Sequence, residues 1–104
     1  MAESFSYKFT GETKALAFEF SETLAVGEGL ATCSCAAVVI DGVDPNPSDL
    51  LASSASIVGT KVVQQVHNGV AGVTYRLVAT VSTSNYNTLI GIGDLPVYST
   101  TEVQ

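Results

Sequence analysis

The stretch that decides the fold reads Thr74-Tyr75-Arg76-Leu77-Val78-Ala79-Thr80-Val81-Ser82. Every second residue from Tyr75 to Val81 is apolar, and most of the residues between them are polar. Because successive side chains of a β-strand point to opposite faces, this spacing puts the apolar set on one face. The stretch therefore predicts a strand with one face against a core and the other turned outward.

Similar alternation recurs along the chain, whereas the helical spacing of apolar residues does not. The next clearest case is Leu16, Phe18 and Phe20, which are separated by smaller or polar residues. Segment 30–40 is uncharged, small and apolar, which predicts a strand buried on much of both faces. In all we predict seven strands, at residues 5–9, 15–20, 30–40, 55–58, 61–67, 74–82 and 89–97.

Turn signals separate these strands. Asn68-Gly69 predicts a tight hairpin, because both residues tolerate the positive φ that such turns require. Ser21-Glu22-Thr23-Leu24 predicts a short helical turn, since Ser or Thr ahead of Glu is a helix start signal. Gly91-Ile92-Gly93 lies within the last strand and indicates a bulge or a close backbone approach. Pro96 lies near the end of the same strand, where a sheet edge tolerates the missing N–H.

Seven or so short antiparallel strands in 104 residues are typical of an all-β, immunoglobulin-like β-sandwich. We expect a single domain of this kind over residues 1–104, with extended N- and C-terminal ends. A small barrel is the alternative fold. The chain has no Trp and its two cysteines are two residues apart, so the Cys–Trp–Cys spacing of antibody domains is absent.

The composition excludes two classes of partner. Ten acids and four bases give a net charge of −6, and the bases are isolated in the sequence. Without a basic stripe to neutralise phosphates or anionic lipids, direct nucleic-acid binding and a polybasic membrane site are excluded. No apolar run approaches the roughly 20 residues of a membrane-spanning helix.

Charged residues are also scarce, at 13% of the chain, about half of the ~25% usual in soluble domains. One explanation is that neighbouring subunits cover much of the surface, since interface cores are depleted of charge. The other is a monomer whose surface is rich in Ser and Thr. Composition does not separate the two.

The residues that enzymes use are missing from the sequence. His67 is the only histidine and lies beside a predicted turn as an exposed residue without partners. No phosphate-binding loop, dinucleotide fingerprint or nucleophile elbow occurs. Cys33 and Cys35 lie on one face of a predicted strand, near the upper distance limit for a disulfide, so we expect free, half-buried thiols. We predict no enzymatic activity, no cofactor and no metal at these residues, because a zinc site needs about four ligands.

Two segments are candidates for protein contacts. The first is the turn-rich loop Asp41–Ser54, because binding residues concentrate on loops held by a rigid scaffold. Its candidate contact residues are Asp41, Asp44, Pro45, Asn46, Pro47 and Asp49. Carboxylate and amide groups are also calcium ligands, but their spacing here departs from the EF-hand pattern and we favour a solvated loop. The second candidate is the pair of chain ends, which would add strands to neighbours through Phe5, Tyr98 and Glu102.

The most recognisable segment is 69–84, a turn with two glycines, a strand that begins with an aromatic residue, and an exit rich in Thr and Ser. Its motif positions are Gly69, Gly72, Tyr75 and Thr83. This pattern resembles the small immunoglobulin-like bacteriophage virion proteins of the fiber–tail adaptor type. Segment 18–30, an aromatic strand followed by a Gly-containing turn, resembles an upstream element of the same group.

The resemblance implies a structural component of a bacteriophage virion, an adaptor at the head–tail neck or at the tail–fiber junction. It implies contacts with portal-side, nozzle, tail-tube or fiber proteins, in a homo-oligomeric ring. Free thiols and the lack of a recognisable secretory signal agree with assembly in the bacterial cytoplasm. The alternatives are a capsid cement or decoration protein, and an immunoglobulin-like adhesion or carbohydrate-binding module.

Overall fold

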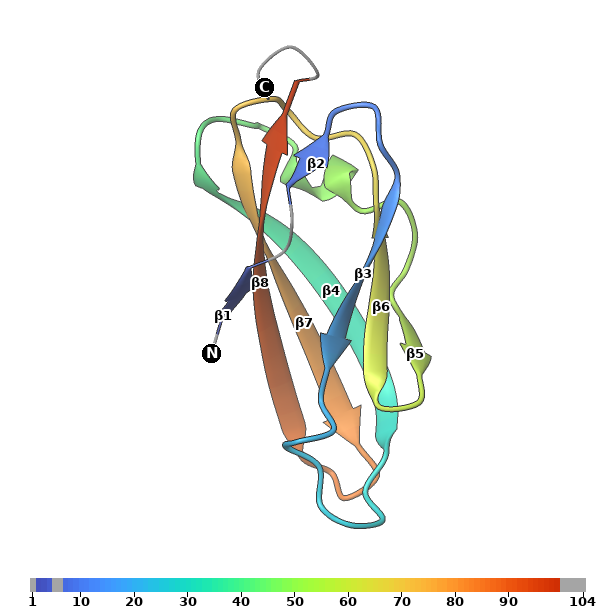
Figure 1. Ribbon diagram of the computed structural model, residues 1–104. Coiled ribbons are helices and arrows are strands. Elements are labelled where there is room, and N and C mark those ends of the chain that lie inside the picture. The colour runs from blue at the N-terminus through green and yellow to red at the C-terminus, as the bar shows by residue number, and fades with distance from the viewer. Residues whose placement is uncertain (1, 5–6, 100–104) are drawn as a thin grey trace.

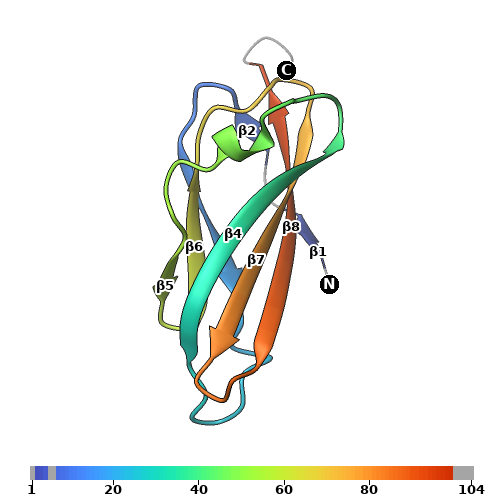
Figure 2. The ribbon, with the colours of Figure 1, turned by 180° about the vertical axis from the view of Figure 1, so that it is seen from behind.

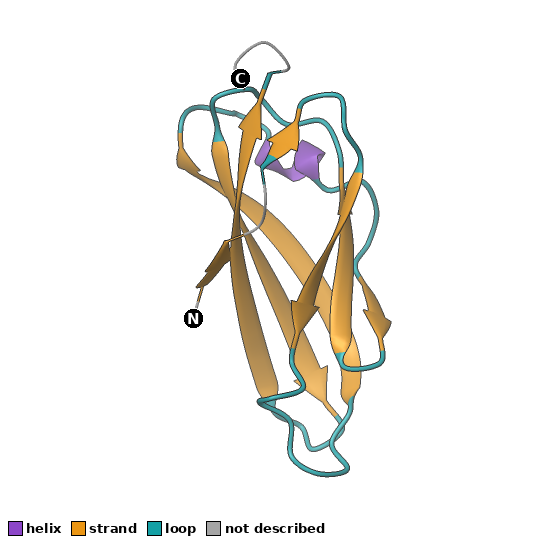
Figure 3. Cartoon of the chain, in the orientation of Figure 1, coloured by secondary structure: helices purple, strands orange, loops and turns teal. Residues whose placement is uncertain are grey.

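The computed structural model describes residues 2–4 and 7–99, and of residues 2–4 the backbone alone. Strands dominate them, and the described residues contain no α-helix (Figure 3). The elements are β1 (Ala2–Ser4), β2 (Lys8–Phe9), β3 (Lys14–Glu19), β4 (Leu30–Asp41), a 3-10 helix (Pro47–Leu50), β5 (Ser56–Val58), β6 (Lys61–Val66), β7 (Thr74–Thr83) and β8 (Thr88–Tyr98). The prediction of an all-β fold is confirmed.

The strands form two sheets that pack face to face (Figures 1 and 2). The larger sheet has the order β1-β8-β7-β4, with β2 also paired to β8, and the smaller has the order β3-β6-β5. The sandwich architecture is therefore confirmed. The immunoglobulin-like topology stays a prediction, which the division of β3 to β8 favours. If β3 to β8 are matched in chain order to strands B to G of an immunoglobulin domain, the smaller sheet β3-β6-β5 corresponds to B-E-D. The strands β4, β7 and β8 of the larger sheet then correspond to C-F-G of that fold.

The core lies between the inner faces of the sheets. The predicted alternation of β7 is confirmed, since every second residue from Tyr75 to Thr83 is buried. The face formed by Leu16, Phe18 and Phe20 is likewise buried in the smaller sheet. Gly91 of β8 lies where a Cβ atom would come within 3.1 Å of the Phe20 ring and 3.3 Å of the Phe18 ring. The close approach expected at Gly91 is confirmed, and the register between β7 and β8 is regular there.

The hairpin predicted at Asn68-Gly69 is wrong, although both residues have positive φ, 52° and 93°. The strands before and after them do not pair, because β6 belongs to the smaller sheet and β7 to the larger. A second turn follows at once, closed by the Val73 N–H to Val70 O hydrogen bond. The local conformation was thus predictable, but the chain uses it to cross between the sheets.

Two other expectations fail. Strand β4 is not buried on both faces: alternate residues from Thr32 to Ile40 are exposed, since β4 lies at a sheet edge. The helical turn predicted at 21–24 is a hydrogen-bonded turn without a helix, closed by the Thr23 N–H to Phe20 O bond. The helical turn that does form lies in the loop expected to be irregular, where Pro47 occupies the first helical position.

The N-terminal strands also correct the prediction of a purely antiparallel fold, because β1 and β2 both pair with β8 in parallel. Strand β8 is therefore an inner strand, and Pro96 is not at a sheet edge. The Val97 N–H donates to Val73 O on the β7 side, so the Pro96 nitrogen points to the opposite side. There β1 ends opposite Asp94 and β2 begins opposite Val97, which leaves the missing N–H at an interruption of the ladder.

Candidate protein-interaction surfaces

The loop after β4 is fixed to the sandwich. Leu50 is 1% exposed, within the core, and its carbonyl accepts the His67 N–H at 2.9 Å. Gly42 has φ +94°, and a Cβ atom there would meet Val73 Cγ2 at 2.9 Å, so the position requires Gly. The loop is thus held against the sandwich at Gly42 and Leu50. Of its predicted contact residues, Asp41, Pro45, Asn46 and Asp49 are exposed, and Asp44 and Pro47 are half-buried.

Asp44 has a structural role inside this loop. One carboxylate oxygen accepts the Asn46 N–H at 2.9 Å, and the other accepts the Tyr75 hydroxyl. Both oxygens are therefore engaged by the protein itself. Within residues 2–4 and 7–99, no group of three or more His, Cys, Asp or Glu side chains is placed to hold a metal ion.

Tyr75 joins this loop to the crossover between the sheets. Its side chain is fully buried, and its oxygen also accepts the Val70 N–H at 2.9 Å. Burial, and then the hydrogen bond to Asp44, raise the pKa of the Tyr75 hydroxyl from 10.0 to about 12. A tyrosine near the start of the corresponding strand of immunoglobulin-like sandwiches bonds to the backbone upstream in a tyrosine corner, and the similar contact here favours that topology, which stays a prediction. Gly69 completes the corner, since a Cβ atom on it would lie 3.2 Å from Val97 and 3.3 Å from Leu50.

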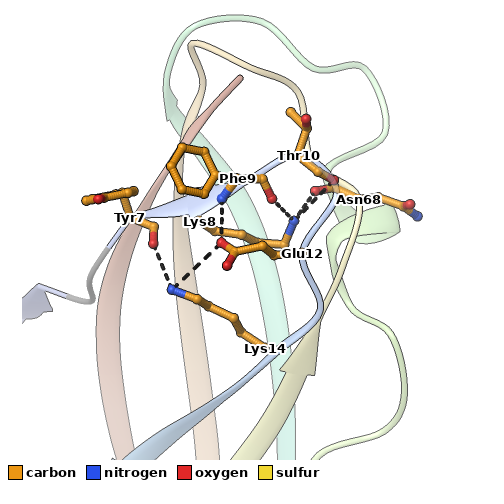
Figure 4. A network of polar contacts seen from close by, with 7 residues as sticks. All are labelled: Tyr7, Lys8, Phe9, Thr10, Glu12, Lys14 and Asn68. Atoms are coloured by element: carbon orange, nitrogen blue, oxygen red, sulfur yellow. Dashed lines mark hydrogen bonds and ion pairs between the residues drawn. The ribbon is translucent and has the colours of Figure 1, made fainter. Parts of the chain in front are cut away.

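Lys8 fixes the N-terminal strand to the same end of the molecule (Figure 4). Its side chain is fully buried, although alternation placed Lys8 on the outer face of the predicted strand 5–9. Its Nζ donates to the carbonyls of Asn68 at 2.6 Å, Phe9 at 2.8 Å and Thr10 at 3.5 Å. Burial lowers the pKa of this amine, while the nearby Glu12 carboxylate opposes the shift. Sequence reasoning missed this residue because it assumes that a lysine in an alternating strand faces solvent.

The other end of β7 is organised by Thr83 and Glu28. The Thr83 hydroxyl donates to Glu28 Oε2 and accepts the Asn87 N–H at 3.1 Å. Glu28 also accepts the Ala25 N–H at 2.9 Å and the Asn87 side-chain amide at 2.8 Å. The Ala25 N–H first, then the Thr83 and Asn87 side chains, lower the pKa of the Glu28 carboxyl. Glu28, between two glycines in a loop, gave no signal in the sequence.

The outer face of β4, β7 and β8 is poor in charge and carries apolar residues beside small polar ones. Its residues are Thr32, Ser34, Ala36, Val38, Ile40, Asp41, Thr74, Arg76, Val78, Thr80, Ser82, Thr88, Ile90, Ile92, Asp94 and Pro96. An apolar row, Ala36–Val78–Ile92, crosses the three strands. Asp41 lies at the end of the face, and Arg76 and Asp94 form a bidentate pair, with Arg76 Nε to Asp94 Oδ1 at 2.8 Å and Nη2 to Oδ2 at 3.1 Å. The pair raises the pKa of Arg76 and lowers that of Asp94. Val38 lies directly opposite Arg76, and the side chains of Val38, Ile40 and Ile90 on this face are 46%, 45% and 59% exposed.

Of the predicted terminal contact residues, Phe5 and Glu102 lie outside the described residues. Tyr98 ends β8, pairs with Phe9 of β2 and packs edge to face on Tyr7, with ring centroids 5.6 Å apart. Cys33 and Cys35 are free and half-buried, as predicted. Burial, and secondarily the neighbouring Cys33, raise the pKa of the Cys35 thiol to about 11. In the part of the chain that the structure describes, no helix is long and apolar enough to cross a membrane.

Comparison with known proteins gives the chain its family. No curated protein matches it. Residues 8–90, however, match the model of a family of phage structural proteins described as podophage GP4 fiber-tail adaptor protein gp77. That match spans most of the described sandwich, from β2 into β8, and it agrees with the resemblance of segments 18–30 and 69–84. Because it covers far more than half of the sequence, the chain belongs to the podophage fiber-tail adaptor family, whose members are structural proteins of the virion and not an enzyme class.

Proposed function

We propose that this chain joins fibers to the tail of a podophage virion by protein–protein contact, through the outer face of β4, β7 and β8. The observation that carries the proposal is the apolar row Ala36–Val78–Ile92 across this face, flanked by the exposed Val38 and Ile90, on a protein of net charge −6. An outward-facing antiparallel sheet surface is ordinarily polar, and contiguous exposed apolar patches mark interaction sites. The partners would be tail proteins on one side and fibers on the other.

The outer face of the smaller sheet is the less suitable candidate because it is smaller. Its strands β3, β6 and β5 have six, six and three residues, against 12, 10 and 11 in β4, β7 and β8. Like the larger face it carries an oppositely charged pair, with Glu19 directly opposite Lys61. A standard interface covers about 800 Å² of each partner, so the larger sheet is the better candidate for the contact.

Further parts of the proposal concern assembly. The exposed loop residues Pro45, Asn46 and Asp49 add a second contact to a tail or fiber protein. Copies would surround the tail as a homo-oligomeric ring, which agrees with the low charge of the chain. Assembly in the bacterial cytoplasm agrees with its two free thiols.

The test uses a phage whose own gene for this protein is deleted and supplied in trans. Ile90→Glu puts a carboxylate on the proposed contact face, and Val58→Glu is the matched control, because Ile90 and Val58 are both 59% exposed and lie on opposite sheets. We expect Ile90→Glu virions to lose fibers in electron micrographs and Val58→Glu virions to keep them. Fibers retained with both variants would overturn the choice of face.

Mass spectrometry of purified virions tests the broader assignment. The chain should be present and should fractionate with tails when particles are disrupted. Recovery with capsids instead would favour the cement or decoration alternative, and absence from virions would overturn the virion role. In a glycan array, specific binding would favour the carbohydrate-binding alternative.

A further inference from the structure

The free edges of the two sheets are unequal. An unpaired edge strand offers its N–H and C=O groups to any other strand, and proteins limit this by short strands, charges, prolines and bulges. In the described residues, the edge elements β1, β2 and β5 are three, two and three residues long. Strand β3 has six residues, with a charge at each end, Lys14 and Glu19. All these edges carry one of the usual protections.

Strand β4 carries almost none. It has 12 residues, pairs only with β7 among the described strands, and contains no charge or proline from Leu30 to Ile40. Its register irregularities lie at its ends, between Leu30 and Thr32 and between Val39 and Asp41. Residues 32–39 therefore form a regular, uncharged edge.

The direction of the backbone groups on β4 follows from its neighbours. The Thr83 N–H donates to Asn87 O on the β8 side, and backbone groups alternate in direction along an antiparallel strand. Odd-numbered residues of β7 therefore face β8, and even-numbered ones face β4, where Val78 pairs with Ala36. On β4 the even-numbered residues bond to β7, so the free N–H and C=O groups are those of Cys33, Cys35, Ala37 and Val39.

A hollow lies beside part of this edge. It has a volume of about 310 Å³ and an uncharged lining, with Cys33 and Cys35 of β4, Ser53, Ser54 and Ala55 of the segment before β5, and Gln64 of β6 among its residues. Because its volume is limited, an added strand that turns several side chains toward it must carry small ones.

We propose that the occupant is β4 of a second copy of this chain, paired antiparallel across a two-fold axis. Its hollow-facing side chains, which include Cys33, Cys35 and Ala37, are small, as the volume of the hollow requires. An isologous contact brings the same surface of both copies together, and on a chain of net charge −6 the uncharged edge of β4 avoids like-charge repulsion. When Ala36 lies opposite Ala36 of the second copy, residue 33 pairs with residue 39 of that copy and residue 35 with its residue 37. This pairing uses the free backbone groups of all four residues.

This inference does not rest on the proposed function, and the isolated protein tests it. A two-fold contact pairs copies and closes no ring by itself. A ring around the tail would need a second, head-to-tail surface. If the fiber-binding role fails its test, the dimer proposal still stands, and if the dimer fails its test, the fiber-binding role still stands.

Sedimentation of the full chain with reductant present should show a monomer–dimer equilibrium. Ala36→Lys puts two ammonium groups opposite each other at the axis, on an exposed face that needs no repacking. We expect it to weaken the dimer by up to about fivefold. Thr88→Lys is the control, because Thr88 is exposed on the same face but lies two strands away, on β8. A monomeric wild type, or equal weakening by both variants, would overturn the proposal.

Amide hydrogen exchange distinguishes the edge from any other contact. The N–H groups of Cys33, Cys35, Ala37 and Val39 should exchange quickly in dilute monomer and become protected at concentrations that favour the dimer. A dimer in which they stay unprotected would overturn pairing at β4. Protection that appears only after a tail or fiber protein is added would overturn the second copy as occupant.

Discussion

The two ends of β7 are held by the same kind of contact in different surroundings. At one end the hydroxyl of Tyr75 donates to Asp44, and at the other the hydroxyl of Thr83 donates to Glu28. In both cases a strand-end hydroxyl ties β7 to a loop carboxylate distant in sequence. The Tyr75 end also contains Leu50, which is 1% exposed, whereas the loop around Glu28 is mostly exposed. The first end thus depends on burial, and the second on polar contacts.

Removing the apolar anchor should have the largest effect. Leu50→Ala leaves a cavity beneath the loop after β4, and we expect it to lower the free energy of unfolding by about 2–5 kcal/mol. The measurement is urea unfolding. Leu24→Ala makes the same change at the other end, where Leu24 is only half-buried, and should cost less. Equal losses would mean that the two ends do not differ in burial as described.

Removing the Tyr75 hydroxyl should have the next largest effect. Tyr75→Phe leaves the Val70 N–H and the Asp44 carboxylate without this partner, at an expected cost of about 1–3 kcal/mol. Tyr86→Phe is the control, since Tyr86 is 96% exposed. A double-mutant cycle with Asp44→Ala should show coupling between the two residues. Additive costs would contradict the contact.

The same hydroxyl should make the protein sensitive to alkali. Because the Tyr75 pKa is raised from 10.0 to about 12 in the fold, the unfolded chain loses this proton first as pH rises. The contribution is fully present below pH 10 and is lost as pH rises toward 12. Unfolding free energies measured across this range should fall more steeply for wild type than for Tyr75→Phe. Parallel curves would contradict the linkage.

These contacts show what the sequence could and could not predict. Alternation located β7 and β3, because one face of each is buried and side chains on a strand repeat every two residues. The positive φ of Asn68 and Gly69 is also a local property and was predictable. Whether the strand after this turn joins the same sheet as the strand before it depends on the whole fold and was not predictable. Lys8 and Glu28 were missed because each is held partly by groups distant in sequence. Lys8 binds the Asn68 carbonyl, and Glu28 binds the side chains of Thr83 and Asn87.

Asp44 illustrates the same limit within the candidate site. Its residue type and loop position made it a candidate contact residue of a solvated loop, which stays a prediction, and gave no sign that its carboxylate binds Tyr75 and the Asn46 N–H. The family resemblance located Tyr75 and Thr83 but gave neither of their carboxylate partners. The apolar row Ala36–Val78–Ile92 on the outer face was also hidden, since residues 30–40 suggest burial on both sides.

The smallest effect is expected at the Thr83 end, in acid. The pKa of Glu28 is lowered from its ordinary value of 4.5 by the groups that bond to it, so its contribution is present above pH 4.5 and is lost as pH falls through the lower, folded value. Glu28→Gln should therefore be less stable than wild type at neutral pH, and the two should converge in acid. In acid, both wild type and Glu28→Gln should also lose some stability, because the pKa values of Glu19 and Asp94 are lowered in the fold as well. Glu22→Gln, on the same exposed loop, is the control and should follow wild type throughout. A constant gap between wild type and Glu28→Gln would show that Glu28 acts through its shape alone, and the two ends of β7 would then not respond to opposite extremes of pH.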